Sequence, residues 1–158
     1  MIILGIDPGT AITGYGLIKQ NRKMDLIDYG CIKTSASLTT AERLKELNNQ
    51  LNALIEKYKP DMVAVEDIFF FKNLKTAVKV SQARGVILLA AAKLNIPVFE
   101  CTPLQVKQAI TSYGRAEKIQ VQKMVKVLLN LKEIPKPDDA SDALAVAICC
   151  ANSVNKGY

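Results

Sequence analysis

The chain starts with a run of apolar residues that ends abruptly in an acid. Ile2 to Ile6 (IILGI) is typical of a strand buried on both faces, and Asp7 follows it directly, ahead of Pro8-Gly9-Thr10. A carboxylate at the tip of such a strand lies at the edge of the core, where a charge is costly unless another group compensates it. Asp7 is therefore the first candidate for a functional side chain.

Three further acids are placed in a similar way. Glu66 closes the apolar run 62–65, and Asp139 and Asp142 stand at the start of a predicted final helix that is otherwise apolar. Residues three apart on a helix share a face, with Cβ atoms about 5–6 Å apart. Carboxylates that converge from separate elements are the ligands that hard divalent cations prefer. We therefore expect a metal site made of four carboxylates.

Two other interpretations of these residues remain open. Acids near a helix start also stabilise the helix dipole, which suits Asp138 as an N-cap after Pro137 but explains Asp142 less well. The turn after Asp7 is similar to the Asp-x-Gly-Thr turn with which actin-like ATPases and sugar kinases hold phosphate. Those proteins clamp a nucleotide between two such domains, whereas 158 residues have room for one, and no Walker lysine loop is present.

The composition suits one compact unit. With 158 residues, 49% of them hydrophobic, we expect a single domain over 1–158, with disorder from about residue 153 onward. Four cysteines without a C-x-x-C pair, and no histidine, argue against zinc and favour reduced thiols. No apolar run reaches the roughly 18 residues of a membrane helix and no charged leader is present, so we expect a cytoplasmic protein with no membrane partner.

The charge distribution points to an anionic partner. The net charge is +6, yet residues 1–66 contain eight basic and eight acidic side chains. Residues 102–136 contain seven basic and two acidic side chains, while residues 137–158 contain one basic and three acidic ones. Such a localised cationic surface favours nucleic acid.

The hydrophobic pattern predicts one α/β domain with a mixed five-stranded sheet flanked by helices. The expected strands are 2–7, 14–18, 24–33, 62–66 and 96–101, and the expected helices are 40–59, 73–95, 102–112, 116–130 and 138–153. Short turns make the first three strands an antiparallel meander. A right-handed crossover that pairs the first strand with the fourth would bring Asp7 and Glu66 to one edge. The second half of helix 73–95 is apolar all round, which favours a dimer contact.

Taken together, these motifs resemble the RuvC family of Holliday junction resolvases, from Met1 to about Cys149. The matching stretches are I-L-G-I-D-P-G-T at 3–10, G-Y-G at 14–16, A-V-E at 64–66, F-x-K-N at 70–73, S-Q-A-R-G-V at 81–86, L-Q-V-K-Q at 104–108, A-E-K-x-Q-V-Q at 116–122 and D-A-S-D-A-L-A at 139–145. The resemblance implies an RNase H-like fold, a homodimer, and cleavage of four-way DNA junctions in recombination and repair by paired, symmetric nicks. It also implies Mg²⁺ dependence, with two ions per subunit and Mn²⁺ as a substitute, and a partnership with the RuvA–RuvB branch-migration complex.

The resemblance also implies roles for single residues. The catalytic and metal-binding acids are Asp7, Glu66, Asp139 and Asp142, where some family members have a histidine in place of Asp139. Two cations about 3.5–4 Å apart can activate water and stabilise the leaving oxygen of a phosphodiester. Lys107 and Lys118 match a basic pair near the scissile phosphate, although Lys107 alone would be taken for a solvated surface lysine.

The expected DNA contacts include an aromatic residue. The resemblance matches Phe69 to a base-contacting ring, and Phe70 and Phe71 follow it. Three consecutive side chains cannot all face one core, so one of them is expected to wedge into DNA, where stacking is worth roughly 1–3 kcal/mol per base. The alternative is that all three pack together within a loop. The remaining predicted DNA contacts are Phe70, Lys72, Lys75, Lys79, Arg84, Lys107, Arg115 and Lys118.

Two rival functions are compatible with the same sequence. The first is a different RNase H-like nuclease, which would act on RNA–DNA hybrids or on ribosomal RNA precursors. The second is a junction-binding protein without catalysis, against which the four intact acids argue. Cleavage of a hybrid duplex distinguishes the first, and tight binding without nicking in Mg²⁺ or Mn²⁺ distinguishes the second.

Overall fold

The computed structural model describes residues 1–67 and 74–154. Within these ranges the strands form one five-stranded sheet in the order β3-β2-β1-β4-β5. The strands are β1 (Ile2–Asp7), β2 (Ile12–Gln20), β3 (Met24–Lys33), β4 (Met62–Glu66) and β5 (Val98–Cys101). The helices are α1 (Thr40–Tyr58), α2 (Leu74–Lys93), α3 (Pro103–Thr111), α4 (Lys118–Leu128) and α5 (Asp138–Val154). The predicted element order and the mixed sheet are confirmed.

The sheet topology places the ends of two central strands side by side. Strands β1, β2 and β3 form the predicted antiparallel meander, while β1 pairs with β4, and β4 with β5, in parallel. Ile6 is opposite Val65 in the register of β1 and β4. Because the two strands run in the same direction, Asp7 and Glu66, one residue further along, end at the same edge of the sheet.

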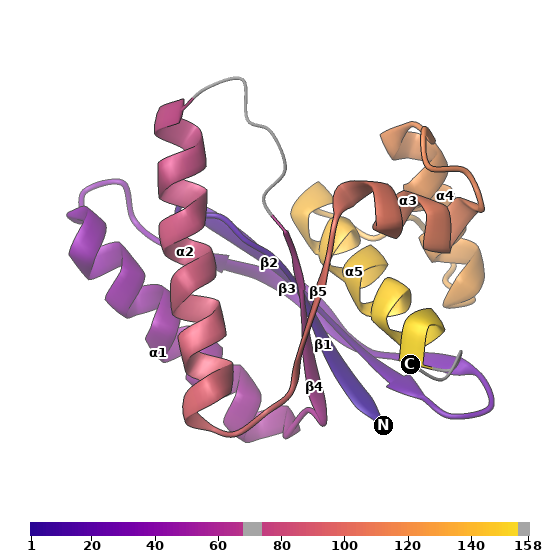
Figure 1. The fold of residues 1–158 in the computed structure, drawn as a ribbon, viewed down its shortest axis with the longest axis horizontal. Coiled ribbons are helices and arrows are strands. Elements are labelled where there is room, and N and C mark those ends of the chain that lie inside the picture. Colours follow the sequence, from indigo (N-terminus) through magenta and orange to yellow (C-terminus); the bar gives the residue numbers. More distant parts are fainter. Residues whose placement is uncertain (68–73, 155–158) are drawn as a thin grey trace.

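Helices cover both faces of the sheet, as Figure 1 shows: α1 and α2 on one face, and α3, α4 and α5 on the other. The alternation along β1 divides its side chains between two cores. Ile3 packs in the core beneath α5, whereas Leu4 and Ile6 pack in the core beneath α1 and α2. This two-sided burial explains why β1 is apolar at every position before Asp7.

Helix α5 lies unusually close to the sheet because glycines face it. A Cβ atom on Gly5 would collide with the backbone of Ala143 and Ala147, and one on Gly14 would collide with the carbonyl group of Asp139. A side chain at either position would push the helix outward. The glycines therefore set the distance between the sheet and the first turns of α5, where Asp139 and Asp142 lie.

Several boundaries differ from those predicted. Strand β2 extends beyond 14–18, and β5 begins at Val98 instead of residue 96. Helix α4 begins at Lys118, and the N–H of its N-cap Glu117 donates to the side chain of Gln120 at 2.7 Å. Helix α5 continues to Val154, past the predicted onset of disorder, and residues 155–158 lie outside the described part of the chain.

Two local predictions about helix starts have different outcomes. Thr102 is the N-cap of α3, as expected, with Pro103 at the first helical position. Asp138 was wrongly assigned as an N-cap: it is the first residue of α5, and the carbonyl of Pro137 accepts hydrogen bonds from the N–H groups of Ala140 and Ser141.

The cysteines are reduced, as the sequence predicts. Cys31, Cys101, Cys149 and Cys150 are all free, and the last three are buried. Among the described residues, no helix combines the length and the apolar character that crossing a membrane would require.

Candidate active site at the sheet edge

The loop that follows Asp7 is held by a set of hydrogen bonds. The buried hydroxyl of Thr13 donates to the carbonyl of Gly9 at 2.5 Å, and the hydroxyl of Thr34 donates to the carbonyl of Thr10 at 2.5 Å. Arg43 on α1 in turn donates from Nε to Oγ1 of Thr34 at 2.9 Å. The turn is thus anchored to β2, to the end of β3 and to α1, which fixes the end of β1.

The first turns of α5 bring two more acids to this edge. The carboxylate of Asp142 accepts a hydrogen bond from Nζ of Lys118 at 2.9 Å, and Asp138 lies 3.4 Å from the same nitrogen. Lys118 is the first residue of α4, so this contact joins α4 to α5. The sequence does not predict this salt bridge between Asp138 and Lys118, because a contact between two helices leaves no periodic signal in the sequence.

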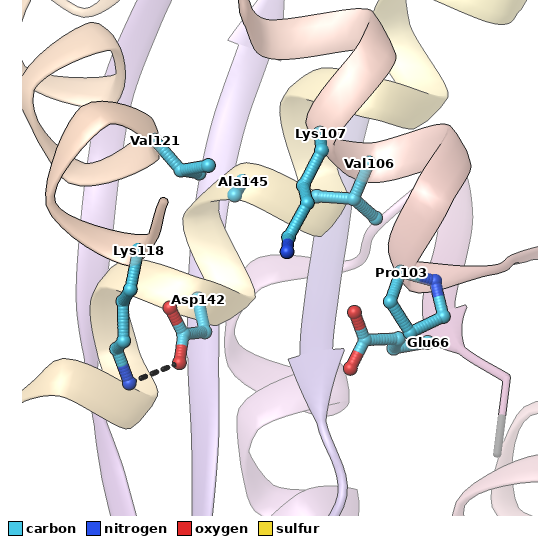
Figure 2. Close-up of a pocket in the computed structure, with 8 residues that line it drawn as sticks. All are labelled: Glu66, Pro103, Val106, Lys107, Lys118, Val121, Asp142 and Ala145. Carbon is cyan, nitrogen blue, oxygen red and sulfur yellow. Dashed lines mark hydrogen bonds and ion pairs between the residues drawn. The ribbon is translucent and has the colours of Figure 1, made fainter. Parts of the chain in front are cut away.

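A cavity of about 260 Å³ collects four of the predicted site residues. Its charged lining is Glu66, Lys107, Lys118 and Asp142, and its apolar lining is Pro103, Val106, Val121 and Ala145. In Figure 2, Lys107 extends from α3 into the space between Asp142 and Glu66, while Lys118 approaches Asp142 from the opposite side. Carboxylates and ammonium groups from four separate elements therefore converge on one space.

The acids at this edge disfavour one another's charge. The pKa of Asp7 is raised from 3.8 to about 7, first by burial and then by the nearby charges of Glu66, Asp142 and Asp139, against a smaller opposing effect of Lys118. Burial followed by the charge of Asp142 likewise raises the pKa of Glu66 from 4.5 to about 7, and Lys107 and Lys118 oppose this shift. The two strand-end acids are thus held in an environment with too little positive charge.

The two acids on α5 belong to the same electrostatic group. Burial raises the pKa of Asp142, which the hydrogen bond and charge of Lys118 counteract, and Asp138 and Asp139 raise it again. Asp139 is half-buried and contributes to the raised pKa values of Asp7 and Asp142. All four predicted acids therefore interact electrostatically at one edge of the sheet.

The donor set fits a hard divalent cation chemically. Carboxylate oxygens are the ligands that Mg²⁺ prefers, and a bound cation would supply the positive charge that Asp7 and Glu66 lack. Within residues 1–67 and 74–154, no three acidic or cysteine side chains converge closely enough to hold an ion as they stand. Mutual repulsion of four carboxylates, with Lys118 bound to one of them, accounts physically for such spacing.

The structure describes only some of the predicted DNA contacts. Phe69, Phe70 and Lys72 lie outside the described residues, and for Lys75 only its place in the first turn of α2 is described. Lys79 on α2 and Arg115 between α3 and α4 are exposed, as a phosphate contact requires.

Arg84, also a predicted DNA contact, has two acidic partners within the chain. Its side chain is only 17% exposed and forms salt bridges with Asp67, at 3.2 Å, and with Glu100. Because two acids occupy its guanidinium group, we exclude Arg84 from the DNA contacts that we propose. The sequence placed it correctly on a helix but carried no sign of its partners.

The comparisons with known proteins cover nearly the whole chain. The family model described as crossover junction endodeoxyribonuclease RuvC matches residues 3–150. Crossover junction endodeoxyribonuclease RuvC from Ruminiclostridium cellulolyticum is 58% identical over 158 residues, which cover 99% of this chain and 95% of that protein. The RuvC protein of Alkaliphilus metalliredigens is 59% identical over 154 residues, covering 97% of this chain and 94% of that protein.

Solved structures give the same result for the fold. Thermus thermophilus RuvC in complex with a Holliday junction substrate is 34% identical, with a TM-score of 0.91, and the match covers 99% of this chain and 97% of that one. The yeast mitochondrial Holliday junction resolvase Ydc2 shares the fold, with a TM-score of 0.70 at 16% identity, over 95% of this chain and 78% of that one. The predicted RNase H-like fold is thereby confirmed. Its sheet, its cavity of paired acids and lysines, and the match over residues 3–150 together establish that the chain belongs to the RuvC family of crossover junction endodeoxyribonucleases.

Proposed function

We propose that this protein resolves Holliday junctions in DNA recombination and repair, by hydrolysing one phosphodiester in each of two opposed strands. The observation that carries the proposal is the cavity in which Glu66 and Asp142 face Lys107 and Lys118, close enough to the half-buried Asp7 for the charges of Glu66, Asp142 and Lys118 to shift its pKa. Acids and lysines at one point suit a phosphate, because the acids hold cations and the lysines hold anionic oxygens.

We assign Asp7, Glu66, Asp139 and Asp142 as ligands of two Mg²⁺ ions, for which Mn²⁺ can substitute. When bound, the metal lowers the pKa of water and stabilises negative charge on the phosphate. The chain's own contribution is to hold the four carboxylates on elements that packing fixes: two strand ends and the first turns of one helix.

Lys107 and Lys118 bind and orient the scissile phosphate in this proposal. Lys107 reaches into the cavity from α3, where it lowers the pKa of Glu66 by its charge. Lys118 bonds to Asp142 and Asp138, and so lies at the entrance of the same cavity. Two ammonium groups on opposite sides of one space can stabilise the extra charge that a phosphate acquires in the transition state.

A homodimer would place two such sites on one junction. Along α2, Val78, Gln82, Gly85 and Leu89 follow helical spacing, and all four are exposed. Val78 and Leu89 are 51% and 53% exposed, and a Cβ atom on Gly85 would meet nothing within 4 Å. This stripe lies opposite the face that packs on the sheet, and it suits a symmetric contact with the same helix of a second subunit.

The DNA would be held mainly through its phosphates. We propose Lys75, Lys79 and Arg115 as phosphate contacts, together with Phe69 or Phe70 as the aromatic contact to bases. The basic segment 102–136 surrounds the cavity through α3 and α4 and adds a favourable field for DNA. We also propose that the junction is delivered by the RuvA–RuvB branch-migration complex.

The test is a cleavage assay with mapped nicks on a synthetic four-way junction, with and without Mg²⁺. The expected result is a pair of nicks at symmetric positions on opposed strands, only when Mg²⁺ or Mn²⁺ is present. A linear duplex and an RNA–DNA hybrid of the same sequence serve as controls. Preferential cleavage of the hybrid, or tight junction binding without any nick, would overturn the proposal.

A further inference from the structure

Arg84 joins helix α2 to the ends of two strands. It lies near the middle of α2, and its salt-bridge partners are Asp67, the residue after β4, and Glu100 on β5. The guanidinium is mostly buried, whereas Asp67 and Glu100 are about half exposed. Both salt bridges are made by the same nitrogen, Nη2, and removing one partner of a mostly buried ion pair costs more than removing one partner of an exposed pair.

The two acids belong to neighbouring parallel strands at the active-site edge. In the register of β4 and β5, Val65 is opposite Glu100 and Glu66 is opposite Cys101. The N–H of Asp67 donates to the carbonyl of Cys101 at 2.7 Å, which continues the pairing one residue past Glu66. Glu66 therefore lies between two residues of β4 that β5 holds in place: Val65 is opposite Glu100, and Asp67 is hydrogen-bonded to Cys101.

Arg84 neutralises charge where the strands end. Without it, the carboxylates of Asp67 and Glu100, which come from the adjoining ends of β4 and β5, would repel each other on the face that α2 covers. The resulting repulsion would act on the last residues of β4. Arg84 also fixes the distance between α2 and this strand end, because its side chain contacts both.

From these contacts we infer that Arg84 is a positioning residue for cleavage: it holds the end of β4 so that Glu66 faces the cavity shared with Lys107 and Asp142. The inference rests on the proposed nuclease function. Arg84 follows Ala83, which is buried against the sheet, and precedes Gly85 in the exposed stripe of α2. The helix that we propose for contact with the second subunit thus also carries the residue that positions Glu66.

The experiment compares Arg84→Gln and Arg84→Lys with the wild-type protein, using single-turnover junction cleavage at saturating protein. A small displacement of a catalytic group can reduce a rate by up to about 100-fold. We expect Arg84→Gln to lower the cleavage rate by roughly tenfold or more and to raise the Mg²⁺ concentration needed for half-maximal rate. Arg84→Lys, which keeps the charge but loses the planar fork, should recover part of both quantities.

Junction affinity and its salt dependence separate positioning from a direct DNA contact. A positioning residue leaves the junction Kd and its salt slope unchanged, measured in Ca²⁺ to prevent cleavage. Loss of a phosphate contact would instead weaken binding and reduce the salt slope by about one. Lys45→Ala, which removes an exposed charge on α1, is the matched control and should match wild type in every measurement.

Glu100→Gln provides a second, milder variant in case Arg84→Gln folds poorly. It leaves Arg84 paired with Asp67, so the Mg²⁺ requirement should shift in the same direction by a smaller factor. Equal rates and equal Mg²⁺ requirements for wild type and both well-folded variants would overturn the inference, as would a loss confined to junction affinity. Failure of the wild-type protein itself to nick junctions would instead refute the proposed function.

Discussion

At the scale of single residues, the acids of the site lie where their negative charges repel one another. Asp7 is half-buried near three other carboxylates, and its pKa rises to about 7 as a result. A structural carboxylate would be expected to gain a neutralising partner, and the raised pKa indicates that the four acids together lack one. The cation that we propose for this site would supply that charge, which gives two testable consequences.

We expect Asp7→Asn to abolish junction cleavage and yet raise the stability of the metal-free protein. The amide keeps the shape of the side chain but removes a buried charge that its neighbours repel. Cleavage assays and thermal unfolding in EDTA would measure both effects, with junction affinity in Ca²⁺ as the control for binding. A variant that binds junctions poorly or melts below wild type would contradict this expectation.

The stability of the metal-free protein should fall as pH rises. Asp7 and Glu66 have pKa values of about 7 in the fold, against ordinary values of 3.8 and 4.5. The folded state therefore binds more protons than the unfolded state between about pH 4 and 7, so the free energy of unfolding decreases across that range and levels off above it.

Thermal unfolding from pH 5 to 8 in EDTA would reveal this trend, and Mg²⁺ at pH 8 should restore the lost stability by binding the folded state. The double variant Asp7→Asn, Glu66→Gln should show a flatter profile and little response to Mg²⁺. An unchanged wild-type melting temperature over the whole range would exclude the two acids as the origin.

At the scale of elements, the site depends on how closely α5 approaches the sheet. We expect Gly14→Ala to lower stability by about 1–3 kcal/mol, because the added methyl group meets the carbonyl of Asp139 and cannot be accommodated by a flexible side chain. Cleavage should fall as well, because the start of α5 would move. The comparison is Gly114→Ala, whose methyl group meets mainly the end of the exposed Leu104 side chain, at 3.0 Å, and should leave the melting temperature nearly unchanged.

The elements also show which features a sequence can predict. The N-cap Thr102, the apolar run of β1 and the acids at strand ends are local patterns, and the sequence was sufficient for them. The contacts of Lys118 with Asp138 and of Arg84 with Asp67 and Glu100 depend on how separate elements meet, which no local period encodes. For that reason the sequence predicts neither the acidic partners of Arg84 nor the contact of Asp138 with Lys118.

At the scale of the whole molecule, the exposed stripe on α2 should govern assembly. We expect Leu89→Glu to convert a dimer into monomers, because a charge would be buried at the centre of the proposed contact. Sedimentation would report the mass, and the monomer should lose paired nicking. Val127→Glu, on the exposed end of α4 at 66% exposure, makes the same chemical change elsewhere and should remain dimeric.

The fold also has a consequence for the synthesis of the protein. Asp7 lies on β1, the first element of the chain, while Asp139 and Asp142 lie on α5, the last described one, and α5 packs directly on β1. A polypeptide still emerging from the ribosome therefore cannot assemble the site until its final helix has been translated. Fragments left by interrupted translation or by proteolysis that end before α5 would lack Asp139 and Asp142, so we expect them to be unable to nick a junction.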